Sequence, residues 1–246
     1  MWQRCLVILC LLLATLVSKA AYADIVTLTG TVMRTDSVES GSWGVQAYVS
    51  PLMLHDVSGV LEDDIIGFCG DRTTLVSRDF QTKGQEYYWA SLGDVPGNIY
   101  DTGTRNSIQE LFDHTYGYAF SVDGILLDLT VVQALQLALW KIISPEYPIL
   151  APSNYSYDLT EQFLTALNGG DWADVQWNGK DFTENFHTDI LVFWTTPTKT
   201  SQTMISASYG MGNGFNMTPE PATLAIFGFG FFGVGFTIRR RFQKIV

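Results

Sequence analysis

The residue of this sequence with the greatest intrinsic reactivity is Cys69, in the segment GFCGD at residues 67–71. The 246-residue chain has three cysteines, and the other two, Cys5 and Cys10, lie in an N-terminal segment with the layout of a secretory leader. An exported protein that loses this leader keeps a single cysteine, which has no partner for an internal disulfide. Such a thiol is either a small core residue, since free cysteine packs well, or a nucleophile kept for one reaction.

Two glutamines lie in an apolar segment, residues 129–143, and this segment is the second candidate for chemistry. Gln133 and Gln136 are about one helical turn apart, and Trp140 follows Gln136 by four residues. A buried carboxamide is costly unless its hydrogen bonds are satisfied. Taken alone, the pattern fits glutamines that make structural hydrogen bonds.

A cysteine hydrolase would need a base near Cys69 and a group to orient that base. The available histidines are His55, His114 and His187, and none lies in a recognisable catalytic signature. They also lack the spacing of metal ligands, so we expect no metal site and no cofactor. The acidic pair Asp63–Asp64 indicates a solvated turn, with a calcium-binding loop as the alternative. We expect the chain not to be an enzyme.

The first residues predict an export signal. Arg4 precedes an apolar run at residues 5–17, and the small residues of the AYA segment come next. A signal peptidase reads small residues at these positions, so we expect residues 1–23 to be a signal peptide cut between Ala23 and Asp24. The apolar run is too short for a comfortable membrane span.

The last residues combine three features in order. A Pro-Glu-Pro motif is followed by the uncharged, glycine-rich residues 222–238 and then by a basic cluster, which would hold the C-terminus in the cytoplasm. The residues of the motif and cluster are Pro219, Glu220, Pro221, Arg239, Arg240 and Arg241. A plain tail anchor would share the apolar run and the arginines.

This C-terminal arrangement resembles the PEP-CTERM sorting signal of Gram-negative bacteria. The resemblance covers residues 217–246 and implies an exosortase-type enzyme that cuts at the motif after a transient membrane-inserted stage in the inner membrane. It implies a final location at the cell surface or in the extracellular matrix, typically of bacteria that make exopolysaccharide. The tail would then be an address that is removed, as a GPI signal is.

The segment between the two signals, residues 24–216, is long enough for one sizeable domain. The chain has 14 basic and 25 acidic residues; without six basic residues of leader and tail and without Glu220, eight and 24 remain. So negative a domain repels nucleic acid and anionic membranes, which excludes both as lasting partners.

The local pattern of this domain predicts an α+β fold with a β-sandwich or barrel-like framework and an inserted helical subdomain. Residues 25–33 alternate apolar and polar, residues 43–50 keep β character, and residues 189–196 and 199–209 predict two strands joined through Pro197. Residues 129–143 are apolar nearly all round and predict a buried helix.

Two further helices are expected in the insertion. The first begins with a cap at Asn106 and places Ile108, Leu111 and Phe112 on one face. The second has Asp158 and Glu161 at capping-box spacing and ends at Gly169.

Three short blocks, in order, resemble the thioester domains of bacterial surface adhesins. They are FCGD at residues 68–71, QLALW at residues 136–140 and SQTMIS at residues 201–206. The resemblance implies an internal thioester between Cys69 and Gln202, with Phe68, Gln136 and Trp140 supporting the site. The sequence departs from the family pattern at Leu135, Gly70 and Ser201, where a threonine, a larger apolar residue and an apolar residue are usual.

The chemistry that the resemblance implies is acyl transfer. A thiolate that attacks a carboxamide expels ammonia and leaves an activated acyl group, which survives only where water is kept out. Phe68, Trp140, Phe193 and Trp194 could supply the apolar shield. We therefore expect a surface protein that attaches covalently to an amine or hydroxyl of a partner protein or polysaccharide. The alternative is a non-covalent matrix protein associated with exopolysaccharide, without a formed thioester.

Overall fold

The computed structural model describes residues 24–33, 37–40, 45–48, 51–61, 64–71, 80–146, 155–195 and 202–209. The expected signal peptide, the sorting segment and Pro197 lie outside these residues. Within them, no helix has the length and apolar character needed to cross a membrane.

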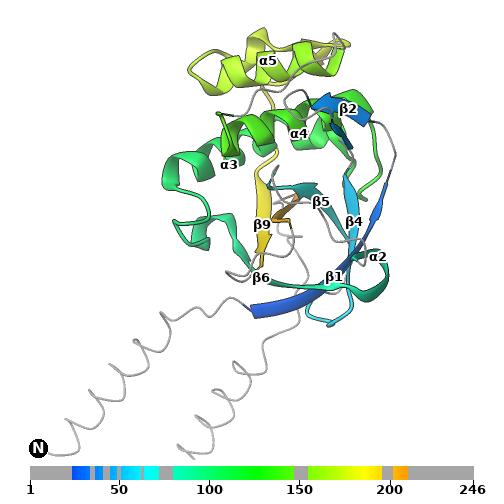
Figure 1. The fold of residues 1–246 in the computed structure, drawn as a ribbon. Coiled ribbons are helices and arrows are strands. Elements are labelled where there is room, and N and C mark those ends of the chain that lie inside the picture. The colour runs from blue at the N-terminus through cyan, green and yellow to red at the C-terminus, as the bar shows by residue number, and fades with distance from the viewer. Residues whose placement is uncertain are drawn as a thin grey trace, which may run out of the picture.

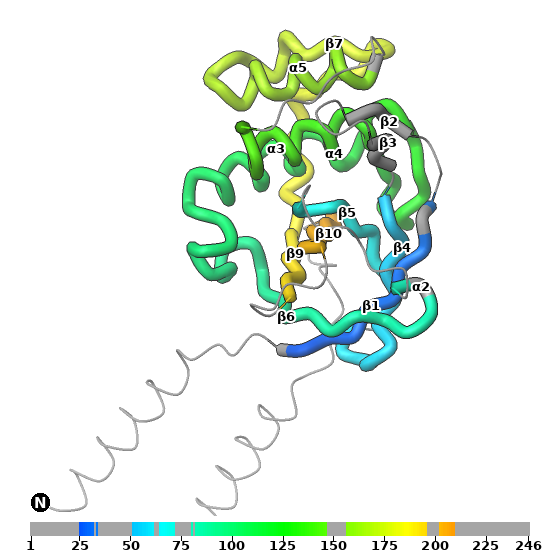
Figure 2. Tube along the Cα trace, in the orientation of Figure 1, coloured from blue at the N-terminus to red at the C-terminus, as the bar shows by residue number. Residues whose placement is uncertain are grey.

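Six antiparallel strands close into a barrel in the order β1-β4-β5-β10-β9-β6. Their bounds are β1 Asp24–Val32, β4 Leu52–Asp56, β5 Ile65–Cys69, β6 Gln85–Ser91, β9 Thr188–Trp194 and β10 Met204–Tyr209. Figure 2 shows β5 and β10 side by side, although more than half of the chain separates them in sequence. The barrel realises the barrel-like form of the predicted framework, and the α+β fold class is confirmed.

Three helices between β6 and β9 form the predicted insertion: α3 Thr102–Ala119, α4 Leu129–Ile143 and α5 Tyr155–Leu167. Helix α3 contacts β9 and β10, α4 lies against α3 and β5, and α5 packs on α4 farther from the barrel. Figure 1 shows this layering, with α5 at the top and the barrel below.

Shorter elements complete the described chain. They are the hairpin β2 Ser37–Ser40 and β3 Val45–Tyr48, α2 Phe80–Lys83, η1 Leu92–Asp94, η2 Trp172–Asp174, and the hairpin β7 Gln176–Trp177 and β8 Lys180–Asp181. Helix α2 lies against β1 at the edge of the barrel, where Phe80 is buried in the barrel interior with Val26 and Leu28 of β1.

The two faces of the barrel strands have different partners. Side chains such as Phe68, Val192 and Ile205 join the cores of α3 and α4 in one cluster. Side chains that alternate with them, such as Leu54, Phe193 and Met204, fill the barrel interior in a second cluster. Because strand side chains alternate between faces, neighbouring residues of β5 and β10 serve different cores.

Both helix-cap predictions were wrong. Helix α3 begins at Thr102, and its cap is Asp101, whose carboxylate accepts a hydrogen bond from the Thr104 backbone N–H at 2.7 Å. Asn106 therefore lies within the helix. Helix α5 begins at Tyr155, so Asp158 lies in its first turn, where a carboxylate favours the positive end of the helix dipole.

The predicted buried faces were correct. Ile108, Leu111 and Phe112 are fully buried on one side of α3. Helix α4 has the predicted bounds, and its N-cap is Asp128, which accepts from the backbone N–H groups of Thr130 and Val131. This cap also pairs with Lys180 at 2.8 Å and so ties the start of α4 to β8.

Candidate functional site around Cys69

Cys69 is the last residue of β5, and its side chain lies on the barrel-interior side of the strand. Its neighbour Phe68 points the other way and packs edge-on against Phe112 of α3, with ring centroids 5.2 Å apart. Met204, the residue paired with Cys69 on β10, belongs to the barrel-interior core. Alternation along the strand therefore separates the thiol from the helix-facing core.

Gln136 of α4 holds the backbone of Cys69 by both ends of its carboxamide. The Cys69 backbone N–H donates to Gln136 Oε1 at 2.8 Å, and Gln136 Nε2 donates to the Cys69 carbonyl oxygen at 2.9 Å. The side chain is 1% exposed. A carboxamide bound in this way acts as an additional strand neighbour at the end of β5, and its two polar atoms are both occupied.

Trp140 adds a second donor from the next turn of α4. Its indole Nε1 donates to the Cys69 carbonyl oxygen at 2.9 Å. Gln136 and Trp140 are four residues apart, so they project from the same face of the helix. This spacing lets Gln136 and Trp140 both donate a hydrogen bond to the same carbonyl oxygen, that of Cys69.

Gln202 lies two residues before the start of β10 and is 6% exposed. Its Nε2 donates to the Asp71 carbonyl oxygen. The same carboxamide lies close enough to the Cys69 thiol to lower the pKa of that group. The β5–β10 ladder ends at the pair of Cys69 and Met204, which is closed by the bond from the Gly70 backbone N–H to the Thr203 carbonyl at 2.8 Å. The structure thus brings together a thiol and a carboxamide from residues that are far apart in sequence.

The thiol of Cys69 is a poor nucleophile at rest. Its pKa is raised to about 12, chiefly by burial and to a smaller extent by the negative charge of Asp71, while the neighbouring Gln202 carboxamide offsets part of the shift. At neutral pH the group is therefore a neutral thiol. Any attack by the sulfur needs a base to remove the proton.

Tyr100, which the sequence patterns did not single out, contacts the backbone just after β5. Its hydroxyl donates to the Gly70 carbonyl oxygen at 2.7 Å, and the side chain is buried. A Cβ on residue 70 would lie 2.7 Å from this hydroxyl and 3.0 Å from Ile205 Cγ1. Gly70 is therefore required by the close approach of Tyr100, which gives a reason for its departure from the family pattern.

The expected aromatic shield is differently arranged. Phe68 and Trp194 face the helices, so they support the strands from the side opposite the thiol. Phe193 is paired with Met204, which is paired with Cys69, so these three residues form one row on the barrel-interior face. Phe193 and Met204, and not Phe68 or Trp194, therefore lie on the thiol's side of the strands.

The histidines have other surroundings. His55 contacts Asp64 at 2.7 Å on the surface, and the His114 ring stacks on Trp172 with centroids 4.4 Å apart. His187 has a positive φ of 47° next to β9. Across the described residues, no hydrogen bond joins a histidine to Cys69, so the Cys–His pair of a cysteine hydrolase is not formed there.

Metal-binding clusters were also sought. The described part of the chain has no group of three or more His, Cys, Asp or Glu side chains that could hold a metal ion. Asp63 lies outside the described residues, so the calcium-loop alternative for residues 63 and 64 is not tested.

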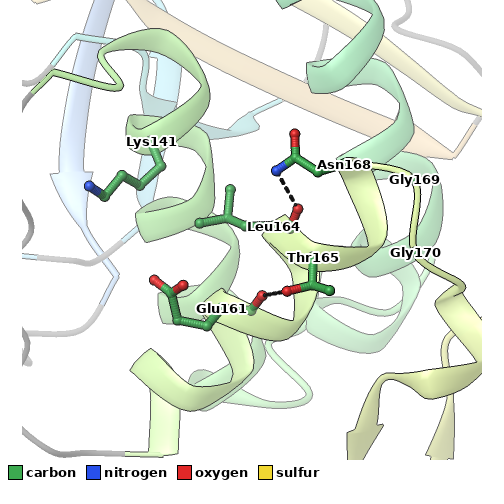
Figure 3. A pocket seen from close by; sticks show the side chains of 7 residues that line it. All are labelled: Lys141, Glu161, Leu164, Thr165, Asn168, Gly169 and Gly170. Carbon is green, nitrogen blue, oxygen red and sulfur yellow. Dashed lines mark hydrogen bonds between the residues drawn. The ribbon is translucent and has the colours of Figure 1, made fainter.

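A separate cleft of about 570 Å³ lies on the outer side of the helical layer. Figure 3 shows its lining, which comes from α4, α5 and the turn after α5: Lys141, Glu161, Leu164, Thr165, Asn168, Gly169 and Gly170. Asn168 Nδ2 donates to the Leu164 carbonyl at 2.7 Å and Thr165 Oγ1 to the Glu161 carbonyl at 2.8 Å. The hydrogen bonds of Cys69 described above are made with Gln136 and Trp140, and neither residue lines this cleft.

Comparison with known families finds a PEP-CTERM protein-sorting motif at residues 218–241. This match includes the Pro-Glu-Pro segment and the three arginines, so the chain carries the export and surface-sorting signal that the sequence predicted. No curated protein sequence matches the chain significantly.

Solved structures similar to this chain include two thioester domains and the N-terminal domain of a pilus tip adhesin. The N-terminal thioester domain of fibronectin-binding protein SfbI from Streptococcus pyogenes is 15% identical, with a TM-score of 0.41 over 70% of this chain and 92% of that one. The N-terminal domain of the Streptococcus pyogenes pilus tip adhesin Cpa is 14% identical, with a TM-score of 0.41 over 78% and 97%. The thioester domain of the Staphylococcus aureus TIE protein is 9% identical, with a TM-score of 0.40 over 74% and 92%. Roles for individual residues rest on the contacts described above.

Proposed function

We propose that this exported protein stores an activated acyl group as an internal thioester between Cys69 and Gln202, and uses it to attach covalently to a nucleophile on a partner surface. The observation that carries the proposal is the pairing of a single thiol with a buried carboxamide. The Gln202 carboxamide lies beside the thiol, whose pKa it lowers, and donates to the Asp71 carbonyl, while Gln136 fixes the backbone of Cys69.

Gln136 and Gln202, the two buried glutamines of the described residues, have different roles in the proposed reaction. Gln136 uses both polar ends of its carboxamide on the backbone of Cys69, so its displacement would leave the Cys69 N–H without a partner. Gln202 is the carboxamide next to the sulfur. In thioester formation the Cys69 sulfur bonds to Cδ of Gln202, the C–N bond breaks, and the nitrogen leaves as ammonia.

The barrel supplies the conditions that the bond needs. Met204 and Phe193 lie beside the thiol on the same face of the barrel strands and keep part of its surface from water, while Cys69 itself is half-buried. Water that reached the bond would hydrolyse it to a glutamate. A partner amine or hydroxyl would attack the same carbonyl carbon, form an amide or ester with residue 202, and return the sulfur as a thiol. Covalent capture of this kind is adhesin-like and happens once per molecule, so the protein is not a turnover catalyst.

The sorting motif at residues 218–241 indicates that this chemistry takes place outside the cell. We propose that an exosortase-type enzyme cuts at Pro219–Pro221 after a membrane-inserted stage, and that the domain then meets its target outside the cell. The target class that fits the chemistry is an amine or hydroxyl on a protein or polysaccharide. The acidic surface predicted by the composition disfavours nucleic acid as the partner.

Methylamine tests the proposal on the released protein. It should add to the acyl group at Gln202 and liberate the thiol of Cys69, which a thiol reagent then labels. Cys69→Ala and Gln202→Ala should take up no methylamine. Gln133→Ala is the matched control, because Gln133 lies one turn from Gln136 on α4 and accepts from Ser156 Oγ at 2.7 Å instead of binding Cys69. Equal uptake by wild type and Gln202→Ala would show that Gln202 is not the acyl partner.

A further inference from the structure

Three of the five large apolar side chains that the described residues expose lie in one short connection, between α3 and α4. Val122, Ile125 and Leu127 are 72%, 62% and 56% exposed. Single exposed apolar side chains are common on protein surfaces, but three within six residues form a patch, and such patches mark interaction sites. We call residues 121–127 the apolar tip.

Hydrogen bonds hold the apolar tip in a fixed turn. The Ser121 N–H donates to the Ile125 carbonyl at 2.9 Å, and the Ile125 N–H donates to Ser121 Oγ at 3.1 Å. The Leu127 N–H donates to the Ala119 carbonyl at 2.9 Å. Gly124 takes a positive φ of 71° within the turn. Because the turn is already formed, little conformational entropy is lost when its apolar side chains are covered.

The chain leaves the barrel beside the apolar tip. Tyr209, the last residue of β10, donates its hydroxyl to the carbonyl oxygen of Phe120 at 2.5 Å, and Phe120 directly precedes the tip. Half-buried aromatic rings continue this surface, because the Phe186 ring centroid lies 5.2 Å from that of Tyr118 and 6.0 Å from that of Tyr209. Residues 210–221 separate the exit from the apolar run at 222–238 and can span about 40 Å at most.

We propose that the apolar tip rests on the lipid surface of the membrane while the run at residues 222–238 is still inserted in it. The inference rests on the membrane-inserted stage of the proposed function, because insertion brings the exit at Tyr209 close to the bilayer. Aliphatic side chains on a surface turn bury themselves at the headgroup boundary, and tyrosine rings suit the same depth. The tether amplifies the weak affinity of this small patch for as long as the tail stays inserted, and the contact is lost on release.

The charges around the tip select the type of lipid. Asp123 in the tip and Asp181 and Glu184 after β7 are exposed acidic residues, and the Tyr118 hydroxyl ties residue 181 to this surface by donating to its carbonyl. The nearby Lys180 ammonium is already paired with a carboxylate, that of Asp128. Anionic headgroups would repel this surface, so the lipid that fits is zwitterionic.

The tip and the proposed thioester lie toward opposite ends of the same strands. A Cβ on Gly124 would lie 3.5 Å from Ile66 Cδ1 near the start of β5, whereas Cys69 ends that strand. On β10, Tyr209 at the exit is about 17 Å along the strand from Met204, the residue paired with Cys69. A tip that rests on lipid therefore turns the thioester away from the membrane and from the amine headgroups of its lipids, which are nucleophiles.

Fluorescence of a labelled tip tests the contact. Ile125→Cys in a Cys69→Ala background leaves one thiol for a nitrobenzoxadiazole dye, because Cys5 and Cys10 lie in the expected signal peptide. The background also makes the result independent of thioester formation. The full chain is exported in a Gram-negative host without an exosortase, purified with its tail and reconstituted in phosphatidylcholine vesicles. We expect the dye emission to shift to shorter wavelength and to be quenched by spin-labelled lipid.

Matched variants separate contact by the tip from adsorption of the dye. Adding Val122→Ser and Leu127→Ser removes two exposed side chains and should abolish most of the quenching. Val57→Ser is the control, because Val57 in the turn after β4 is 54% exposed and lies outside the tip, and it should leave the quenching unchanged. Thermal unfolding of each variant checks that the fold is retained.

A second dye position tests the orientation. Asn98 is exposed and lies two residues before Tyr100, whose hydroxyl donates to the Gly70 carbonyl beside the proposed thioester. A dye on Asn98→Cys, in the same background, should stay unquenched. Quenching of this dye as strong as that of the dye at residue 125 would overturn the proposed orientation.

Flotation of the vesicles distinguishes failure of this inference from failure of the proposed function. If the chain floats with the lipid but the dye at residue 125 is not quenched, or if Val122→Ser with Leu127→Ser changes nothing, the inference is overturned and the membrane-inserted stage stands. A wavelength shift without quenching by lipid, in a chain that self-associates, would place a second copy on the tip and also overturn the inference. A chain that does not float overturns the membrane-inserted stage and this inference with it.

Discussion

Replacing Gln136 tests how the site is held, and the structure sets the size of the effect. Gln136→Ala removes two hydrogen bonds, at 2.8 and 2.9 Å, from the backbone of Cys69. The Cys69 carbonyl keeps the Trp140 indole as a donor, but its N–H loses its partner. An unsatisfied buried donor costs about 1–3 kcal/mol, and the lost packing of a side chain that is 1% exposed adds to it. We expect the free energy of unfolding to fall by about 2–4 kcal/mol.

Urea unfolding measures this cost best in a Cys69→Ala background, because an intact thioester would cross-link the chain and obscure it. Gln133→Ala in the same background removes one hydrogen bond, to Ser156, and should cost about 1 kcal/mol. Gln136→Leu keeps the volume of the side chain and so isolates the loss of hydrogen bonds. If Gln136→Ala costs no more than Gln133→Ala, the carboxamide does not hold β5 as described.

Three further results are expected. Gly70→Ala should lower thermal stability, because its Cβ would lie 2.7 Å from the Tyr100 hydroxyl, and Tyr100→Phe should remove part of that loss; equal losses in both backgrounds would refute the contact. In Gln202→Ala, Cys69 should resist alkylation at neutral pH, and alkylation at the rate of an exposed cysteine at pH 7 would contradict this. The contribution of the thiol to the free energy of unfolding should be constant below pH 9 and fall between pH 9.0 and about 12, because only the unfolded chain loses the thiol proton in that range. Terminal sequencing of the released protein should find Asp24 at the start and no residue from 222–238, whereas released material that keeps Phe227 or Arg240 would indicate a simple tail anchor.

Periodicity along the sequence predicted the three long helices and the first and last strands of the barrel, but it did not identify β4, β5 or β6 or the pairing of the strands. Helix α4 has the predicted bounds because its apolar residues suit burial on nearly every side. Strands β1, β9 and β10 also follow their predicted segments. Closure of the barrel depends on contacts between distant strands, such as β5 with β10, and no local pattern encodes that register.

Errors at helix starts have a local cause. Asp101 and Asn106 are both residue types that cap helices, and the chain uses the earlier one because the turn from Thr102 to Arg105 is itself helical. At α5, Asp158 and Glu161 have capping-box spacing, yet the helix begins three residues before Asp158. Spacing alone does not tell a cap from a first-turn carboxylate.

At the site, sequence blocks indicated which residues meet, but not how they meet. Cys69, Gln136, Trp140 and Gln202 were singled out by short motifs. The structure places Gln136 and Trp140 on the backbone of Cys69 and Gln202 beside its thiol. The contact of Tyr100 with Gly70 has no motif, since a tyrosine in a loop carries no spacing signal. The glycine was the available sign, because a missing Cβ often marks a close approach.

Intact mass of the freshly released protein tests the central claim most directly. A thioester between Cys69 and Gln202 leaves the wild type lighter than its sequence by one ammonia, and Cys69→Ala and Gln202→Ala each return to the full mass of their sequences. Prior hydrolysis is recognised by peptide mapping as glutamate at position 202. A full-length mass in the wild type, with an unmodified Gln202 and a free Cys69, would contradict the account.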